Sequence, residues 1–403
     1  LQKEQLLEKV REIDALLVRS ETKVTKEVIA AAKNLKVIGR AGVGVDNIDL
    51  EAATARGIVV VNSPEASSIT VAEHTLGLML SLARKIPSAN ASLKGGKWEK
   101  KKFMGIELRS KTLGVVGMGR IGSQVVKRAK AFEMDVLAYD PYLSEKQARA
   151  MGAKVTDLET VLREADFISL HVPLTDKTRG LIGKETLEKM KKTAYVVNCA
   201  RGGIIDEKAL FEALSSGRIA GAALDVFEKE PPLESPLLKL ENIILTPPLG
   251  ASTVEAQLHA SVIVCEEVAN VLQNRAARNV VNMPVLAPEA LEELKNFIPL
   301  AEGLGRFAIQ LSKGRVGDVD VTYAGGLKDF QDLGVLTNAL LCGLLAPILT
   351  EGINLFNAPI IARNRGIRVT EGKREDSEKY QNLIDLKVRT DAWETTLKGT
   401  LLG

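Results

Sequence analysis

The stretch TLGVVGMGRIG, residues 112–122, decides the fold. It begins as a short apolar run, typical of a buried strand, and leads directly into the spacing Gly-x-Gly-x-x-Gly from Gly117 to Gly122. An amphipathic segment, IGSQVVKRAKAFE (121–133), follows, and Asp140 ends the next apolar run, DVLAYD (135–140). Strand, glycine loop, helix and acidic residue in this order predict a Rossmann dinucleotide-binding unit.

The glycine loop also predicts how a dinucleotide would be held. Gly117 allows the tight turn, Gly119 lets the backbone approach the pyrophosphate, and Gly122 lets the helix pack on the strand. The helix N-terminus offers free N–H groups to the phosphates. Asp140 is expected to accept hydrogen bonds from the adenosine ribose and to repel a 2′-phosphate, so NAD is favoured over NADP. The predicted contacts of this unit are Gly117, Gly119, Arg120, Ile121, Gly122 and Asp140.

Similar apolar runs recur on both sides of this unit and alternate with amphipathic segments such as 208–217. Runs rich in Val, Ile and Leu that end in Gly, Pro, Asn or Asp are typical of buried parallel strands. We therefore predict a doubly wound α/β fold. The further runs are 14–20, 36–40, 58–64, 166–173, 194–202, 221–228 and 242–248.

The alternation breaks near 284–290, where two prolines occur. Beyond it we predict strands over 318–327 and 382–390, a helix over 335–356 and a charged surface loop over 373–380. This pattern indicates a separate α+β domain over 290–403. Because the sequence opens at Leu1 without a methionine and stops at Gly403 close after a strand, we expect a fragment whose last domain is incomplete.

The composition excludes several classes of protein. A content of 45% hydrophobic and 26% charged residues is that of a globular chain, and 403 residues suggest two or three domains. The net charge of +3 is too balanced for a general nucleic-acid or membrane-surface binder. The three cysteines have no CxxC spacing, which argues against a metal site or a disulfide framework and favours a reducing compartment, the cytoplasm. The longest apolar stretch, 339–349, is too short to span a bilayer.

Several motifs together resemble a known family. NCARGGIIDE (198–207), ALDVFEKEPP (223–232) and TPPLGAST (246–253) resemble signatures of the D-2-hydroxyacid dehydrogenases. GRAGVGVDNIDLEAAT (39–54) and INLFNAPIIARNRGI (353–367) narrow the likeness to the long-form D-3-phosphoglycerate dehydrogenases, whose intervening domain the region 290–403 resembles.

The resemblance implies a fold and its division into domains. The expected fold is two doubly wound parallel-sheet lobes, one of them the Rossmann unit, plus a C-terminal α+β intervening domain. Residues 1–84 and 265–289 would form the substrate-binding lobe, 85–264 the NAD-binding domain, and 290–403 the intervening domain. Helices over 73–86 and 88–103 would join subunits in a homodimer or homotetramer.

The resemblance also implies NAD-dependent oxidation of 3-phospho-D-glycerate to 3-phosphohydroxypyruvate, the first step of phosphorylated serine biosynthesis. The family's catalytic arginine corresponds to Arg201, whose planar fork suits a carboxylate, and its glutamate to Glu230, which would charge and orient an imidazole. The substrate is then a small phosphorylated 2-hydroxy acid. No metal, nucleic acid or membrane partner is expected.

Further binding residues follow from the same resemblance. The expected substrate contacts are Arg19, Arg40, Ala41, Gly42, Gly44 and Lys100. The expected cofactor contacts beyond the glycine loop are Val43, Val172, Cys199, Ala200, Arg201, Asp225, Gly250 and Ala251, with Asp225 at the nicotinamide carboxamide. Cys199 would line the site without acting as a nucleophile, because no histidine neighbours it in sequence.

One position departs from the family. Its catalytic histidine should follow Thr246-Pro247, where this sequence has Pro248, which cannot titrate. His74, His171 and His259 offer no evident replacement. Losing one general acid–base costs about 10²–10⁴-fold in rate, so we expect impaired catalysis. Two alternatives stay open: a hydroxypyruvate or glyoxylate reductase, and a non-catalytic NAD-binding sensor or scaffold.

Overall fold

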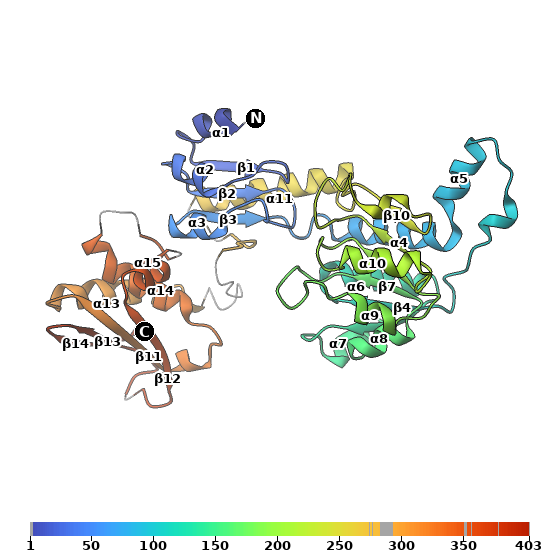
Figure 1. Cartoon of the computed structure of the whole chain (residues 1–403). Coiled ribbons are helices and arrows are strands. Elements are labelled where there is room, and N and C mark those ends of the chain that lie inside the picture. Colours follow the sequence, from blue (N-terminus) through green and yellow to red (C-terminus); the bar gives the residue numbers. More distant parts are fainter. Residues whose placement is uncertain are drawn as a thin grey trace. The chain divides into compact units, whose positions relative to one another are not determined.

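The computed structural model describes residues 3–273, 275, 277–282, 293–349, 353–355, 357–377 and 379–402 (Figure 1). The chain divides into two compact units, one formed by Leu1–Ser63 and Ser261–Gly403 and the other by Pro64–Ala260. The predicted boundaries at 84/85 and 264/265 stay predictions. The boundary at 289/290 lies outside the described residues.

The unit Pro64–Ala260 is built on a 7-stranded parallel sheet of order β10-β9-β8-β7-β4-β5-β6. The chain proceeds outward from the central pair in both directions, through β5 and β6 on one side and β8 to β10 on the other. Doubly wound sheets bind ligands at such a switch point, beyond the carboxyl ends of the strands. The strands are β4 (Thr112–Val116), β5 (Asp135–Tyr139), β6 (Lys154–Val155), β7 (Phe167–Leu170), β8 (Tyr195–Asn198), β9 (Gly221–Leu224) and β10 (Ile243–Leu245).

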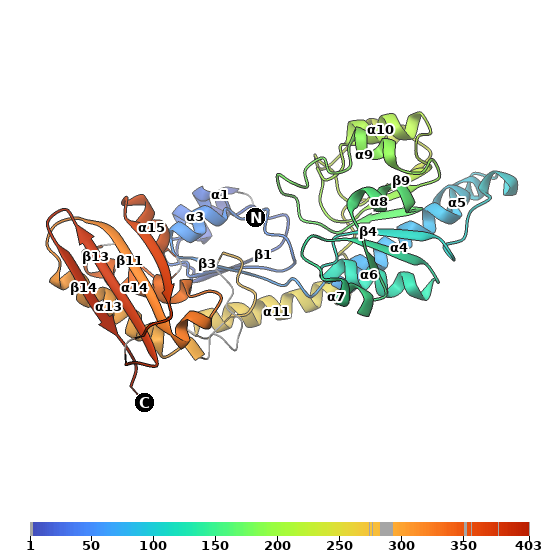
Figure 2. The same ribbon diagram turned by 90° about the horizontal axis from the view of Figure 1, so that it is seen from below.

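Helices cover both faces of this sheet, which is why its strands are apolar throughout rather than alternating. α4 and α6 pack with Leu113 and Val115 on one face, while α8, α9 and α10 pack with Val116 and Ile168 on the other (Figure 2). This confirms the doubly wound prediction. The helices and turns of this unit are α4 (Ser68–Arg84), α5 (Ile86–Lys94), η1 (Lys100–Phe103), α6 (Arg120–Ala131), α7 (Glu145–Ala150), α8 (Leu158–Glu164), α9 (Lys184–Lys189), α10 (Glu207–Ser215) and η2 (Pro236–Lys239).

A second parallel sheet, β1-β2-β3, forms the start of the chain. One face packs under α1, α2 and α3, and the other receives Val264 and Val268 of α11. Gly39 leaves room for that helix, because a Cβ there would lie 2.7 Å from Val268 Cγ2. The elements are α1 (Lys3–Lys9), β1 (Ala15–Val18), α2 (Lys26–Ala31), β2 (Val37–Arg40), α3 (Leu50–Ala55), β3 (Val59–Asn62) and α11 (Val254–Leu272).

The C-terminal region is an α+β domain, as predicted, built on a 4-stranded mixed sheet of order β12-β11-β13-β14. α13, α14 and α15 bury its apolar residues in one core. The elements are α13 (Phe297–Leu311), β11 (Val316–Gly325), η3 (Gly326–Asp329), α14 (Gly334–Leu345), η4 (Ala346–Ile348), α15 (Ala358–Asn364), β12 (Arg368–Arg374), β13 (Asn382–Thr390) and β14 (Glu394–Gly399).

Three predictions for this domain need correction. The strand predicted over 318–327 is β11, which begins at Val316 and ends at Gly325, where η3 follows. The helix predicted over 335–356 ends at Leu345 and gives way to a 3-10 turn, because Pro347 has no N–H to donate and its ring crowds the preceding turn; residues 350–352 and 356 lie outside the described part. The loop predicted over 373–380 begins at Glu375, two residues later than expected, because β12 runs to Arg374. Residue 378 of this predicted loop lies outside the described part.

Helices α13 and α14 approach so closely that glycine is required at their crossing. A Cβ on Gly305 would lie 1.9 Å from the Leu340 carbonyl oxygen, and one on Gly343 would lie 1.8 Å from that of Glu302. Gly303, two residues before Gly305 in α13, has no atom within 4 Å of its Cβ position. The same helix therefore offers one glycine fixed by packing and one that is not.

We expect Gly305→Ala to destabilise the C-terminal domain by about 1–3 kcal/mol, because the two backbones must separate. Gly303→Ala is the matched control and should gain up to about 1 kcal/mol from helix propensity. Amide hydrogen exchange in β11 and α14 measures both. Equal protection in the two variants would contradict the close crossing.

Candidate active site

The glycine loop lies at the switch point of the large sheet, between the end of β4 and the start of α6. Gly117 has φ +95°, and a Cβ there would meet the His171 carbonyl oxygen at 2.7 Å. A Cβ on Gly122 would lie 2.1 Å from the Gly117 carbonyl oxygen. Gly119 has open space where its Cβ would be. The first and third glycines are thus required by packing, while the second leaves its side open to a ligand.

The first turn of α6 begins where the glycine loop ends. Gly119 is its N-cap, and none of the described side chains caps the helix. The N–H groups of an uncapped first turn and the helix dipole attract phosphate oxygens. The open N–H groups and the helix dipole at this point are both expected from the Gly-x-Gly-x-x-Gly motif.

Asp140 follows the last residue of β5 and is held against the glycine loop. Its Oδ2 accepts the Met118 N–H at 2.8 Å, and its Oδ1 accepts the Tyr142 N–H at 2.9 Å. A carboxylate oxygen can accept about two hydrogen bonds, so each oxygen keeps capacity for a ribose hydroxyl. The internal bonds fix the side chain beside the loop before any ligand arrives.

His171 and Val172 follow the end of β7 and lie beside Gly117 of the glycine loop. Ser169 Oγ lies 2.8 Å from His171 Nε2, and His171 Nδ1 is buried without a hydrogen-bond partner in the described part of the chain. Burial lowers the pKa of His171 to about 4, so the ring is neutral at neutral pH. His171 contacts the loop through its backbone carbonyl rather than through a charged ring.

Arg201 lies on the loop after β8. Asn198 orders this loop, with its Oδ1 accepting the Ala200 N–H at 3.0 Å and its Nδ2 donating to the Arg201 carbonyl at 2.9 Å. Arg201 Nη1 donates to the Ala200 carbonyl at 2.7 Å, and the side chain makes further interactions. Cys199 is buried beside it, and burial raises the pKa of that thiol to about 12, which fits a lining residue rather than a nucleophile.

The Arg201 loop contacts the loop that carries Glu230. Gly202 backs onto the Phe227 carbonyl oxygen, which a Cβ would approach to 1.8 Å. Glu230 Oε1 accepts the Phe227 N–H at 3.1 Å. Glu207 lies in the same cluster and was not predicted. Burial raises its pKa, and the charges of Glu228 and Glu230 raise it further.

Asp225 follows β9 and is buried, and its carboxylate accepts several hydrogen bonds. We call this group of contacts the Asp225 hub. Asp225 Oδ1 accepts from Thr246 Oγ1 at 2.7 Å and from the Leu249 N–H at 2.8 Å, and its Oδ2 accepts the Gly250 N–H at 2.8 Å. His74 Nε2 lies 3.0 Å from Oδ1. Sequence reasoning missed this last contact, because no spacing rule links residues that are 151 positions apart.

Pro248 lies in the turn that Asp225 holds. Its neighbours Leu249 and Gly250 both donate to Asp225, and its own carbonyl accepts from Ser252 Oγ at 3.3 Å. The backbone of the turn is therefore ordered around a side chain without any acid or base. Ala251 follows in the same turn and is exposed.

The predicted substrate contacts at the start of the chain lie in the other compact unit. Gly42, with φ +140°, donates its N–H to Ser63 Oγ at 2.7 Å, and Ala41 donates to the Val18 carbonyl at 2.9 Å. These two N–H groups are thus used within the protein. Arg19 is exposed after β1, and Arg40, at the end of β2, donates from Nη1 to the Ala41 carbonyl at 3.0 Å.

Three other predicted contacts are Val43 and Gly44, in the turn after β2, and Lys100, in η1. Val43, next in the turn after Gly42, is held by Asn62 Nδ2, which donates to its carbonyl at 2.6 Å, and the chain continues into Gly44. Lys100 lies in η1 of the larger-sheet unit and is exposed.

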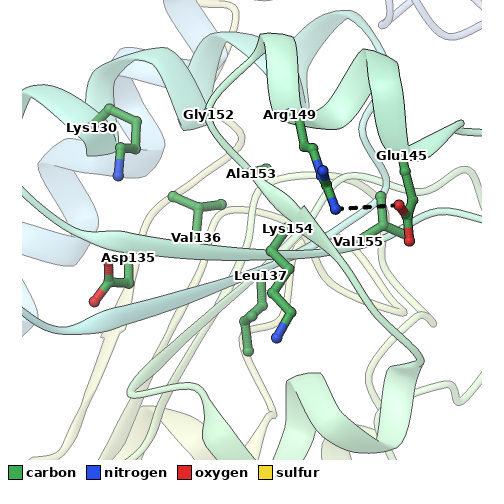
Figure 3. A pocket seen from close by; sticks show the side chains of 10 residues that line it. All are labelled: Lys130, Asp135, Val136, Leu137, Glu145, Arg149, Gly152, Ala153, Lys154 and Val155. Carbon is green, nitrogen blue, oxygen red and sulfur yellow. Dashed lines mark hydrogen bonds and ion pairs between the residues drawn. The ribbon is translucent and has the colours of Figure 1, made fainter.

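A pocket of about 490 Å³ lies at the start of β5 and β6 (Figure 3). Because β4 and β5 run parallel, this is the edge of the sheet opposite to the glycine loop. Figure 3 shows Arg149 paired with Glu145 at 3.5 Å across one turn of α7. The pocket is therefore separate from the predicted nucleotide contacts.

Comparison with known families agrees with this geometry. Residues 76–250 match the model of the D-isomer specific 2-hydroxyacid dehydrogenase NAD binding domain, and residues 293–403 match that of the D-3-phosphoglycerate dehydrogenase intervening domain. The cofactor of the larger-sheet unit is thus NAD. Within the described residues, no group of three or more His, Cys, Asp or Glu is arranged to hold a metal ion.

Among known structures, the chain is similar to the TT0316 protein of Thermus thermophilus, with a TM-score of 0.65 and 38% identity over 70% of this chain and 90% of that one. It is also similar to a D-lactate dehydrogenase of Aquifex aeolicus complexed with NAD and lactic acid, with a TM-score of 0.63 and 32% identity over 69% of this chain and 89% of that one.

Similar sequences extend over the whole chain. A D-3-phosphoglycerate dehydrogenase of Methanocaldococcus jannaschii is 56% identical over 100% of this chain and 77% of its own length. Those of Archaeoglobus fulgidus and Synechocystis are 51% and 49% identical, again over 100% of this chain and over 76% and 73% of theirs. The chain therefore belongs to the D-3-phosphoglycerate dehydrogenase family, within the NAD-dependent D-2-hydroxyacid dehydrogenases.

Proposed function

We propose that the chain oxidises 3-phospho-D-glycerate to 3-phosphohydroxypyruvate with NAD, the first step of phosphorylated serine biosynthesis. The observation that carries this proposal is the glycine loop at the switch point of the sheet, together with Arg201 and Glu230 on two touching loops beside it. Kinship with D-3-phosphoglycerate dehydrogenases over the whole chain supports the choice of substrate.

Each side chain has a role in the proposed reaction. Arg201 would bind the substrate carboxylate and polarise the reacting oxygen through its guanidinium. The open side of Gly119 and the uncapped start of α6 would receive the pyrophosphate of NAD. Asp140 would bind the adenosine ribose and disfavour the 2′-phosphate of NADP. When bound, NAD accepts the hydride.

The phosphorylated end of the substrate needs cations, and we propose Arg19, Arg40 and Lys100 for that task. Because the N–H groups of Ala41 and Gly42 are used within the protein, a backbone clasp for the substrate carboxylate would fall to Val43 and Gly44. Val172, Cys199, Ala200, Gly250 and Ala251 would line the cofactor.

Pro248 supports a proposal of impaired catalysis. The turn around it is fully ordered by Asp225, so the position expected to carry an imidazole is built but holds no group that can move a proton. Glu230 then has no imidazole from this turn to orient. The same observation favours a second candidate, a protein that binds NAD as a sensor or scaffold without turnover.

We propose that the chain forms a homodimer or homotetramer through the segments 73–86 and 88–103. The first was predicted as a helix and lies mostly in α4, whereas the second is not one helix, because α5 ends at Lys94 and η1 begins at Lys100. α5 buries none of its residues, and it extends away from the rest of its unit (Figures 1 and 2). Ile86 is 52% exposed, Leu93 58%, Trp98 83% and Met104 77%. Exposed apolar residues gathered on one arm are typical of a subunit interface.

The remaining assignments are also proposals. Residues 1–84 with 265–289 would bind substrate, 85–264 NAD, and 290–403 would form the intervening domain. Among the described residues, no helix has both the length and the apolar character needed to cross a bilayer. The cysteine pattern underlies the proposal of a cytoplasmic location.

Pro248→His should raise kcat for 3-phosphoglycerate oxidation by about 10²–10⁴-fold, because it supplies the missing general acid–base beside Glu230. The formation of NADH measures the rate. Pro248→Asn is the matched control, since it also removes the proline ring but cannot titrate, and it should gain nothing. Tight NAD binding without any gain in Pro248→His would favour the sensor. Comparing 3-phosphoglycerate with glycerate as substrates tests the reductase alternative.

Asp140→Asn should weaken NAD binding about tenfold or more, because a charged acceptor for the ribose hydroxyls is lost, and should weaken NADP binding less. Calorimetric titration with both nucleotides measures this. Asp135→Asn, at the other end of the same strand, is the matched control and should leave both affinities unchanged. Equal losses for NAD and NADP would argue against a ribose contact.

Trp98→Asp should shift the chain towards a monomer, because a charge at the centre of an apolar contact is costly to bury. Sedimentation equilibrium measures the mass. Trp393→Asp changes the other tryptophan, 55% exposed in the C-terminal domain, and should leave the mass unchanged. A monomeric unaltered chain would rule out the proposed interface.

A further inference from the structure

His74 makes a specific polar contact that the proposed reaction does not use. It lies on α4, which packs into the core of the larger-sheet unit through Val71, Ala72 and Met79. Its Nε2 is 3.0 Å from Asp225 Oδ1 and 3.5 Å from Thr246 Oγ1. The His74 side chain is 21% exposed and that of Asp225 is 3% exposed.

The two carboxylate oxygens of Asp225 accept different numbers of hydrogen bonds. Among the described residues, Oδ1 receives His74 Nε2, Thr246 Oγ1 and the Leu249 N–H, whereas Oδ2 receives only the Gly250 N–H. Since a carboxylate oxygen accepts about two hydrogen bonds, Oδ1 is saturated and Oδ2 has room for one more donor. A new donor, such as a ligand amide, can therefore bind only at Oδ2.

The carboxyl group of Asp225 is charged despite its burial. Burial alone would raise its pKa, but hydrogen bonds from His74, the Leu249 N–H and Thr246, with that from Gly250, outweigh it and lower the pKa. At neutral pH the group is thus an anion with no proton to donate. An anionic acceptor binds an amide N–H more tightly than a neutral acceptor does.

The four donors differ in what holds them. Leu249 and Gly250 belong to the turn itself, and Thr246 precedes it. His74 alone among these four comes from another element, the long helix α4, which also backs onto Gly250, since a Cβ there would lie 3.4 Å from Val71 Cγ2. His74 therefore ties the carboxylate to a part of the core that does not move with the turn.

We propose that His74 is a positioning residue for the nicotinamide end of NAD. By occupying Oδ1, His74 keeps Asp225 turned so that Oδ2 accepts the N–H of the nicotinamide carboxamide. This inference rests on the proposed function, in which Asp225 faces that carboxamide. Without His74, the carboxylate loses the donor that comes from α4 and keeps only donors from Thr246 and the turn. It can then rotate with the turn, and the preference for a carboxamide is lost.

The test uses two dinucleotides that differ at one group. NAD carries a carboxamide, whereas 3-acetylpyridine adenine dinucleotide keeps the carbonyl but has a methyl group in place of the NH₂ donor. Calorimetric titration of the whole chain with each gives an affinity ratio. We expect the unaltered chain to favour NAD about tenfold, which is the range of a hydrogen bond to a charged acceptor.

His74→Leu should bring this ratio close to one by weakening NAD about tenfold while leaving the acetylpyridine analogue unchanged. His74→Gln keeps an N–H donor on a side chain that is long enough to reach Asp225. This variant should retain the preference for NAD. His259→Leu, an exposed histidine on α11, is the matched control. If His74→Leu does not fold, His74→Asn, which is too short to reach Oδ1, gives the same reading.

The outcomes separate the two proposals. If His74→Leu weakens both dinucleotides equally, or keeps the preference for NAD, the positioning role is overturned while the cofactor site stands. If the unaltered chain binds both equally, Asp225 does not meet the carboxamide and the inference fails with it. If neither dinucleotide binds, the proposed function itself fails.

Discussion

The close approach of backbone to backbone at the ends of β4 and β7 is the constraint on which the larger-sheet unit depends. Gly117 lies against the His171 carbonyl, and Gly122 lies against the carbonyl of Gly117, so strand, loop and helix meet backbone to backbone. This contact aims the start of α6 at the switch point of the sheet. The features proposed to bind NAD are arranged around that point.

Much of the fold was predictable because parallel strands buried on both faces are recorded in the sequence as apolar runs. β4, β5, β7 and β8 follow such runs, and the glycine spacing locates the loop between them. β12 and β14 could not be found in this way. RVTEGKR and ETTLKG are polar strands at the two edges of their sheet, and only their pairing with β11 and β13 makes them strands.

The site could be predicted only where it is formed by residues that are close together in the sequence. Asp140 follows from its distance to the glycine loop, but its bond to the Met118 N–H does not. His74 lies on α4, which packs through apolar residues. Nothing near it in the sequence indicates a carboxylate partner. Glu207 ends the NCARGGIIDE motif, yet its raised pKa comes from burial and from charges on another loop. Contacts between distant segments depend on the tertiary fold, which short motifs do not encode.

The Asp225 hub has a consequence for the order in which the polypeptide matures during translation. When synthesis has reached β9, His74 and Asp225 are both present, but Thr246, Leu249 and Gly250, which provide three of its donors, are still to be made. Burying the carboxylate at that stage would leave most of its acceptors unsatisfied. Closure of this region in the nascent chain is therefore unfavourable until β10 and its turn have left the ribosome, so the surroundings of Asp225 are among the last parts of the larger-sheet unit to assemble.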